Sequence, residues 1–173
     1  GSCTNSSYRD LKTVALLLRG KKVHPDVEVG VAPGSRQVVE MLAREGLLTD
    51  LVLAGVRILE NACGFCIGNH MSPGTDAVSL RTSNRNFEGR SGTRSAQVYL
   101  VSPETAAAAA LTGVFTDART LALAEPVAEP EAFARDDSLF LFRETAGRGV
   151  PGAAIVRGPN IGTVPIFGPR TIA

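Results

Sequence analysis

Short β-branched segments alternate with capped helices over the first two thirds of the chain, and this alternation limits the possible folds more than any other feature. The segment "VEVGVA" is typical of a strand, and "PGS" then leads into a helix predicted over residues 36–45. Two later segments, "AVSLRTS" and "AQVYLVS", are also predicted as strands. Such an alternation predicts the α/β class, with a layered, mainly parallel sheet and flanking helices.

Two further helices complete this pattern. Residues 5–19 carry an apolar stripe that Ser6 or Ser7 can cap, and Gly20 ends it. The segment "PETAAAAALTG" has proline at its start and glycine at its end, as a helix often does. The apolar stretch "GVRIL" precedes a glycine-rich segment with two cysteines. We therefore expect this last segment to be a loop that follows a strand.

The composition supports one globular domain followed by a segment of different character. The chain has 173 residues, and 44% of them are apolar, enough for one ordinary core. Proline, glycine and acidic residues become frequent from about residue 125. We predict an α/β domain over residues 1–124 and an extended connector over 125–173 that packs on it or leads to another domain. Because the chain begins with Gly1 rather than Met, we expect a piece of a longer product.

Charge and cysteine content exclude several classes of protein. The net charge is +1, too low to favour binding to nucleic acid or to an anionic membrane surface. No apolar run is long enough to cross a bilayer, and we see no export signal. An odd number of cysteines, three, argues against a disulfide framework. We therefore predict a soluble protein of the cytoplasm that neither spans membranes nor binds nucleic acid.

The three cysteines are the first candidates for a chemical site. Cys63 and Cys66 lie in "NACGFCIGN", after a predicted strand, whereas Cys3 precedes the first predicted helix. Loops that follow parallel strands gather at one edge of the sheet, and ligands bind there. The amides at a helix start also favour a thiolate or an anionic group. We therefore expect the three thiols to converge at this edge.

Four roles remain open for these thiols on chemical grounds. A structural zinc would need a fourth ligand, which His70 can supply. Cys63 and Cys66 also have the spacing of a redox pair, although the following glycines and Pro73 disfavour the helix that usually carries it. Three thiolates can hold an iron–sulfur cluster and leave one iron open as a Lewis acid. The simplest alternative is three unreactive buried cysteines.

A second group of candidates lies in "RTSNRNFEGRSGT". Asn84, Arg85 and Arg90 stand at and just after the end of a predicted strand, on the same sheet edge as the cysteine loop. The guanidinium fork of arginine binds carboxylates with two parallel hydrogen bonds, which lysine cannot do. The alternative is that these residues are solvated at the surface. If these residues instead belong to a binding site, the edge would combine a metal with groups that bind a carboxylate.

Four segments taken together, "GSCTNSS", "APGSRQV", "NACGFCIGN" and "TSNRNFEGRSG", resemble the third domain of the aconitase family of iron–sulfur hydratases. The resemblance covers residues 1–117, and "AAIVRGPNIG" is similar to the connector that precedes the family's last domain. It implies that Cys3, Cys63 and Cys66 bind a [4Fe-4S] cluster. It also implies that Arg85 and Arg90 bind substrate carboxylates and that Asn84 lies beside the cluster. Ser2 belongs to the first cluster motif.

The resemblance implies a hydro-lyase that isomerises citrate and isocitrate through cis-aconitate, with a small tricarboxylate as substrate. Relatives that act on isopropylmalate or homocitrate share "SCTN" and "NRNFEGR" but typically carry serine and methionine between the cluster cysteines. The segment "CGFCIG" and the long connector of this chain therefore favour the citrate enzyme, although Phe65 departs from the proline that is usual in the aconitases. The isopropylmalate or homocitrate enzyme is the alternative within the family.

The resemblance also implies that the rest of the enzyme is needed for turnover. The family's catalytic base is a serine of the last domain, and its acidic histidine and aspartate groups belong to the first domains. No catalytic residue is therefore assigned to this chain, whose partners would be the remaining domains. We expect the isolated chain to be inactive. A non-catalytic iron or redox sensor that uses the same cluster edge is the alternative from another functional class.

Overall fold

The computed structural model describes residues 4–121, 123, 126–133 and 135–138. The chain divides into a compact unit, Gly1–Asp136, and a second unit, Asp137–Ala173. Residues 126–133 form neither helix nor strand, and most of the predicted connector lies outside the described residues. The domain boundary at residue 124 and the extended connector therefore stay predictions.

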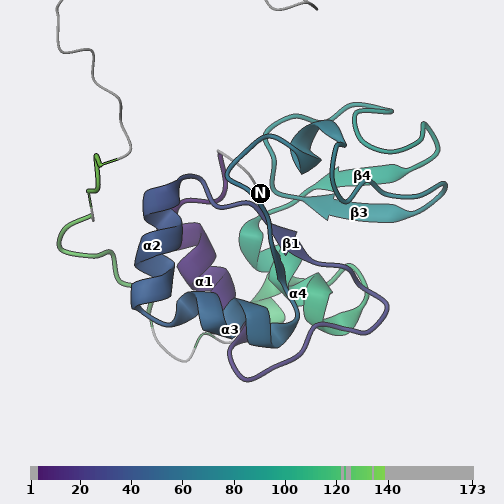
Figure 1. The fold of residues 1–173 in the computed structure, drawn as a ribbon. Helices are drawn as coiled ribbons and strands as arrows, with labels where there is room; N and C mark the ends of the chain where they lie inside the picture. The colour runs from purple at the N-terminus through teal and green to yellow at the C-terminus, as the bar shows by residue number, and fades with distance from the viewer. Residues whose placement is uncertain (1–3, 122, 124–125, 134, 139–173) are drawn as a thin grey trace, which may run out of the picture. The chain divides into compact units, whose positions relative to one another are not determined.

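The predicted α/β class is confirmed, since helices alternate with short parallel strands (Figure 1). The strands form two separate pairs, β1 with β2 and β3 with β4, rather than one continuous sheet. No helix in the described part of the chain combines the length and hydropathy needed to span a bilayer. The elements follow one another as α1 (Tyr8–Leu18), β1 (Gly30–Val31), α2 (Arg36–Arg44), α3 (Leu47–Ala54), β2 (Arg57–Ile58), η1 (Phe65–Ile67), β3 (Val78–Arg81), β4 (Gln97–Leu100), α4 (Pro103–Thr112) and η2 (Ala118–Thr120).

The predicted caps lie where the sequence indicated. The Ser7 hydroxyl accepts a hydrogen bond from the amide of Asp10, whose carboxylate in turn accepts one from the Ser7 amide. Ser35 caps α2 through the amide of Val38. At the end of α4, Gly113 adopts a left-handed φ of 81°, which a residue with a side chain would adopt only with strain. Polar capping therefore fixes these helix ends.

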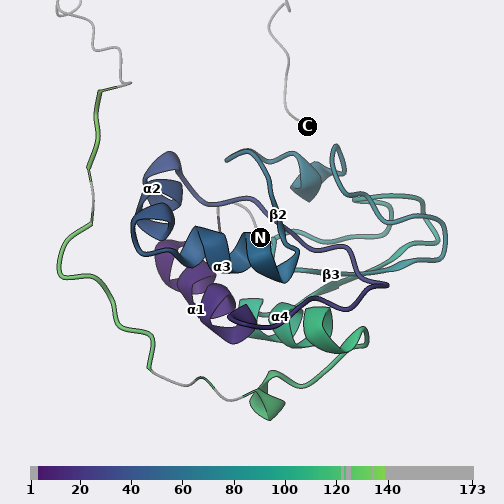
Figure 2. The same cartoon turned by 60° about the horizontal axis from the view of Figure 1, so that its bottom comes forward.

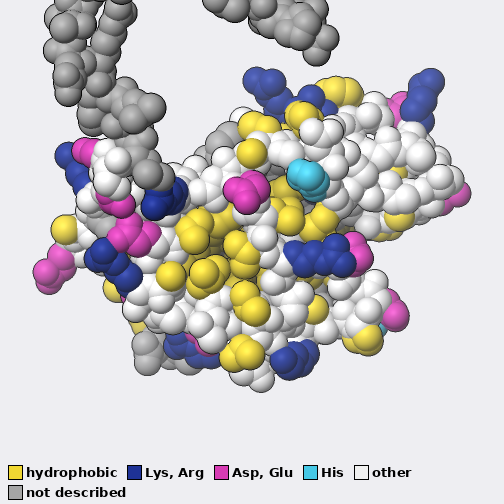
Figure 3. All heavy atoms as spheres, viewed as in Figure 1, with side chains coloured by type: hydrophobic (Ala, Val, Ile, Leu, Met, Phe, Trp, Pro, Cys, Tyr) yellow, Lys and Arg dark blue, Asp and Glu magenta, His cyan; other side chains and the backbone are white. Residues whose placement is uncertain are grey.

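One helix was missed by the sequence analysis. Gly46, with a left-handed φ of 74°, ends α2 and at the same time begins α3. The prediction treated this glycine only as an end. On α3, Val52 and Leu53 are 55% and 61% exposed, so the helix lacks the one-sided apolar stripe that identifies an amphipathic helix. Figure 3 shows hydrophobic side chains gathered over α2 and α3 on this face.

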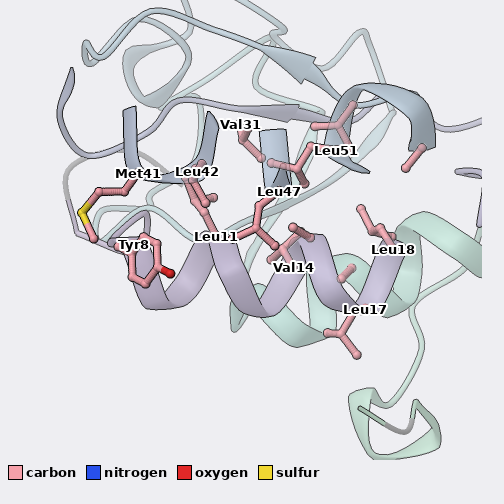
Figure 4. Close-up of a cluster of buried hydrophobic side chains, with 14 residues drawn as sticks. Tyr8, Leu11, Val14, Leu17, Leu18, Val31, Met41, Leu42, Leu47 and Leu51 are labelled. Atoms are coloured by element: carbon pink, nitrogen blue, oxygen red, sulfur yellow. The ribbon is translucent and has the colours of Figure 1, made fainter. Parts of the chain in front are cut away.

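The core forms where α1 packs against its neighbouring helices. Figure 2 shows α1 beside both α3 and α4, and its buried face includes Leu11, Val14 and Leu18. Figure 4 shows these side chains pointing toward Leu42 and Leu47 of the adjoining helices. Each fully buried leucine contributes roughly 1.5–3 kcal/mol. The α1 stripe therefore forms the centre of this core.

A polar triad closes one end of this core. The buried Tyr8 hydroxyl donates to a carboxylate oxygen of Glu45, and Lys12 Nζ lies 2.9 Å from the Tyr8 oxygen and 3.0 Å from Glu45 Oε2. The hydrogen bond from Tyr8 and the Lys12 ammonium lower the pKa of Glu45 below its usual 4.5. Burial raises the pKa of Tyr8. The triad thus links α1 to the residue that follows α2.

We predict that Glu45→Gln removes part of the acid sensitivity of this unit. Because the pKa of Glu45 is lowered by folding, its carboxylate stabilises the fold above pH 4.5, and this contribution is lost as the pH falls through the lower folded-state value. Since Glu45 is partly exposed, the loss of stability at neutral pH should be at most about 1 kcal/mol. Urea unfolding measured from neutral to acidic pH checks this. Parallel pH profiles for the variant and the parent would contradict it, and Glu60→Gln is the control.

Candidate functional site

Three segments of the chain meet at the carboxyl end of β3. Asn5 Nδ2 donates to the carbonyl oxygen of Thr82 at 2.6 Å, which ties the region before α1 to the end of this strand. Arg81, the last residue of β3, donates to the loop that contains Cys63 and Cys66. The segment with Asn84 and Arg90 continues directly from this strand. The described segments therefore come together at the end of β3, although the strands they follow, β2 and β3, belong to separate sheets. Cys3 lies outside the described residues, so the gathering of all the site residues at one sheet edge stays a prediction.

The cysteine loop is a compact turn built around the short helix η1. The Asn69 amide donates to the Gly64 carbonyl at 2.8 Å, and the Gly68 amide donates to the Phe65 carbonyl at 3.2 Å. A Cβ atom at Gly64 would lie 2.5 Å from the His70 ring, so a larger residue there would require this exposed side chain to move. Cys66 is buried, with 7% of its surface exposed, whereas Cys63 is exposed. The loop therefore presents one shielded thiol and one open thiol.

Arg81 holds this loop against β3. Its side chain is buried, and its guanidinium donates to the carbonyl oxygens of Phe65 and Met71, the latter at 3.0 Å. The guanidinium also lies over the Phe65 ring, 5.8 Å from its centroid. Burial lowers the pKa of Arg81 from its ordinary value, and the nearby Cys66 partly opposes this shift. A buried cation thus connects the start of η1 and the residue Met71 beyond it to the strand, and it lies close to a thiol.

Arg90 approaches the same thiol from another segment. Its Nη2 atom lies 4.0 Å from Cys66 Sγ, and its guanidinium lies 5.6 Å from the centroid of the Phe87 ring. Among the described residues, Arg90 Nε and the hydroxyls of Ser83 and Ser91 are buried without a hydrogen-bond partner. Buried polar groups are rarely left in this state unless a ligand, ion or water satisfies them. Unused polar groups are therefore present on Arg90, which neighbours Cys66, and in the segment that follows β3.

Asn84 and Arg85 are exposed in the loop that follows β3. Within the described part of the chain, no carboxylate forms an ion pair with Arg81, Arg85 or Arg90. Arginines elsewhere are commonly paired with acidic side chains, as are Arg9, Arg19, Arg44, Arg57, Arg94 and Arg119. The end of β3 therefore has a local excess of positive charge that can accept an external carboxylate.

The residues present suit a thiolate-bound metal group better than a site for a hard cation. No group of three or more histidine, cysteine, aspartate or glutamate side chains capable of holding a metal occurs among the described residues, which do not include Cys3. Two thiols, two adjacent guanidinium groups and unused hydroxyl donors would suit an anionic iron–sulfur cluster, whose sulfur atoms accept hydrogen bonds. The predicted convergence of all three cysteines, and with it the zinc alternative that includes His70, stays a prediction.

Sequence reasoning found the cysteines and the loop arginines but missed Arg81, Ser83 and Ser91. An arginine at the end of an apolar strand is usually at the surface, and here it is buried because the cysteine loop folds back over it. The available clue was the alternation in "VSLR", which places Ser79 and Arg81 on one side of the strand. Ser79 does accept a hydrogen bond from Arg81 Nε at 3.1 Å.

Comparison with known proteins supports a common origin for this arrangement. The model of the aconitase family (aconitate hydratase) matches residues 1–113. The 3-isopropylmalate dehydratase large subunit of Solibacter usitatus is 51% identical over 124 residues, which are 70% of this chain and 26% of that protein. The corresponding subunit of Wolinella succinogenes is 45% identical over 122 residues, 70% of this chain and 29% of that protein.

A relative that is named for a different substrate has a similar sequence identity to this chain. The homoaconitase large subunit of Thermus thermophilus is 49% identical over 119 residues, which are 67% of this chain and 28% of that protein. The chain thus spans less than a third of the length of each of these three relatives. The family match covers more than half of the chain and includes the cysteine loop, Arg81 and the loop arginines, so the chain belongs to the aconitase family.

Proposed function

We propose that this chain is the cluster-bearing part of a hydro-lyase that moves a hydroxyl group between adjacent carbons of a hydroxy acid of the 3-isopropylmalate or homocitrate class. The observation that carries this proposal is that the arginines near the buried Cys66 form no ion pair with a carboxylate of the described residues. It is supported by relatives named as dehydratase and homoaconitase large subunits. We propose the activity for a longer protein, because the chain spans less than a third of the length of each of these relatives.

Cys3, Cys63 and Cys66 are the proposed ligands of a [4Fe-4S] cluster. When bound, such a cluster supplies an open iron that acts as a Lewis acid toward a hydroxyl group. In this chain, the Arg81 guanidinium keeps the loop of Cys63 and Cys66 in one conformation. Arg90 supplies positive charge beside Cys66, which complements the negative charge of the cluster that the cysteines would hold.

Arg85 and Arg90 are the proposed groups that bind the substrate carboxylates, with Asn84 beside them. Both arginines continue from the β3 end, and no carboxylate of the described residues neutralises them. A guanidinium held there orients a carboxylate through two hydrogen bonds and places the adjacent carbon in a fixed position. No general base is assigned within this chain. The isolated chain is therefore expected to bind a cluster without turning over substrate.

The expectation of a citrate enzyme has less support than its alternative. It depended on the segment "CGFCIG" and on the connector over residues 125–173, most of which is outside the described residues. The relatives compared above carry the names of isopropylmalate and homoaconitate enzymes and share 45–51% of the aligned residues. We therefore propose the isopropylmalate or homocitrate class in place of citrate. No observation favours a non-catalytic sensor, and the cytoplasmic location stays a prediction.

The first test is anaerobic reconstitution of the 173-residue chain with iron and sulfide. We expect a brown protein that retains iron after desalting, and we expect Cys63→Ser or Cys66→Ser to abolish the absorbance because each removes one of three ligands. Arg94→Lys is the control, since Arg94 is exposed and paired with Glu88. A colourless protein, or zinc bound in place of iron after incubation with both metals, would contradict the cluster. The reconstituted chain alone should form no unsaturated acid.

Arg81→Lys is predicted to release iron faster from the reconstituted chain. The ammonium keeps the charge but cannot reach the carbonyls of Phe65 and Met71 together, so the loop loses one of its two attachments. Outer groups that orient metal ligands typically change metal affinity by about 10- to 100-fold, and we expect a release rate about tenfold higher. Iron transfer to a chelator measures this rate. Equal release from Arg81→Lys and the Arg94→Lys control would show that the attachment does not matter.

Arg85→Lys and Arg90→Lys should weaken substrate binding by the complete enzyme. Loss of one charge-assisted hydrogen bond costs about 1.5–3 kcal/mol, so kcat/KM should fall by about tenfold or more. Both variants should retain the iron content of the parent enzyme. Steady-state kinetics with 3-isopropylmalate and with homocitrate identify the better substrate at the same time. Unchanged kinetics for both variants would remove these arginines from the proposed substrate site, with Arg94→Lys again as the control.

A further inference from the structure

The arginines of the proposed substrate site lie in an irregular segment, residues 82–96, which connects β3 to β4 and which we call the arginine loop. The two strands are parallel neighbours, so the loop must run back from the carboxyl end of β3 to the amino end of β4 (Figure 1). Residues 84–89 of this loop are exposed and form neither helix nor strand. A guanidinium there can keep a carboxylate in one position only if the backbone is itself held.

Several contacts give the arginine loop its shape without attaching residues 84–89 to the sheet. The Arg90 amide donates to the Phe87 carbonyl at 2.9 Å, and Gly89 in this turn has a left-handed φ of 75°. Arg94 Nη2 lies 3.2 Å from Glu88 Oε1, but both side chains are exposed, and such an ion pair contributes little to stability. These contacts act within the loop, so they do not determine where it lies along the strands.

Asn86 makes the contact that does attach the loop. Its Nδ2 atom donates to the carbonyl oxygen of Val98 in β4 at 2.6 Å. Within the described part of the chain, no other hydrogen bond joins residues 84–89 to a helix or strand. An exposed asparagine in a loop is ordinarily solvated, whereas this one is bonded to a residue twelve positions away. The position of residues 84–89 against the sheet therefore depends on one carboxamide.

The register of β4 shows that this acceptor belongs to the outer edge of the strand. The Gln97 amide donates to the Ala77 carbonyl at 2.9 Å, and the Val101 amide donates to the Arg81 carbonyl at 2.8 Å. Main-chain groups alternate between the two edges of a strand, so the carbonyl of Val98 is directed away from β3. Asn86 thus uses an acceptor that the β3–β4 pair leaves free, and it fixes the loop along that edge.

The attachment matters most for Arg85, which immediately precedes Asn86. No carboxylate of the described residues forms an ion pair with Arg85, and the Arg85 side chain makes no hydrogen bond to them. Its place is therefore set by its backbone alone. Consecutive Cα atoms are about 3.8 Å apart, so a fixed Asn86 confines the Cα of Arg85 to a small region.

We infer that Asn86 is a positioning residue of the proposed substrate site: its carboxamide holds the arginine loop on the outer edge of β4 and so fixes where Arg85 meets a carboxylate. The inference rests on the proposed function for the role of Arg85. Asn86 acts through Arg85 and requires no contact with substrate or cluster.

The attachment itself is tested on the 173-residue chain, without metal or substrate. Asn86→Ala removes the donor, Asn86→Gln keeps a carboxamide on a longer side chain, and Gln37→Ala is the matched control, since it removes a partly exposed carboxamide from α2. NMR order parameters report on the amides of residues 85–87. We expect rigid values in the parent and in Gln37→Ala, below about 0.6 in Asn86→Ala, and intermediate values in Asn86→Gln. Equal values in the parent and Asn86→Ala would overturn the inference.

The positioning role is tested in the complete enzyme with its better substrate, 3-isopropylmalate or homocitrate. We expect Asn86→Ala to raise KM more than it lowers kcat, to reduce kcat/KM by about three- to tenfold, and to leave the iron content unchanged. Asn86→Gln should recover part of the loss, and Gln37→Ala should match the parent. In an Arg85→Lys background, Asn86→Ala should add little, because both changes affect the same contact.

The two variants separate failure of this inference from failure of the proposed function. A fall in kcat/KM for Arg85→Lys but not for Asn86→Ala would overturn the positioning role and leave the substrate site in place. Fully additive effects of the two changes would also overturn it, since Asn86 would then act independently of Arg85. Normal kinetics for Arg85→Lys would instead remove Arg85 from the substrate site, and the role of Asn86 in that site with it.

Discussion

The buried guanidinium of Arg81 is the interaction on which the candidate site depends. It belongs to β3, and its hydrogen-bond acceptors are the carbonyls of Phe65, the first residue of η1, and of Met71, which follows η1. A buried cation without a carboxylate partner is costly unless its donors are satisfied. If the loop adopted another conformation, the Arg81 donors would lose these acceptors and the buried guanidinium would destabilise the fold. The strand and the cysteine loop therefore stabilise each other, and the position of Cys66 relative to Arg90 follows from both.

Short sequence patterns predicted those parts of the fold that depend on interactions between residues close together in the sequence. Ser7, Ser35 and Gly113 fix helix ends through hydrogen bonds and φ angles that involve only nearby residues. The parallel strands followed from the alternation of elements. Helix α3 was not predicted because Gly46 both ends one helix and begins the next, and because Val52 and Leu53 leave it without a polar face. The separation of the strands into two pairs depends on contacts distant in sequence, which no local pattern encodes.

The candidate site was likewise predicted from the sequence only in part. Cys63, Cys66 and Arg90 were found from residue type and spacing, and the structure places Arg90 beside Cys66. The roles of Arg81, Ser83 and Ser91 depend on burial that arises only when the loop returns to β3. Local sequence cannot distinguish an arginine that ends a strand in solvent from one that ends it beneath a loop. The substrate class depends on residues outside the described part, which is why relatives changed the expectation from citrate to isopropylmalate or homocitrate.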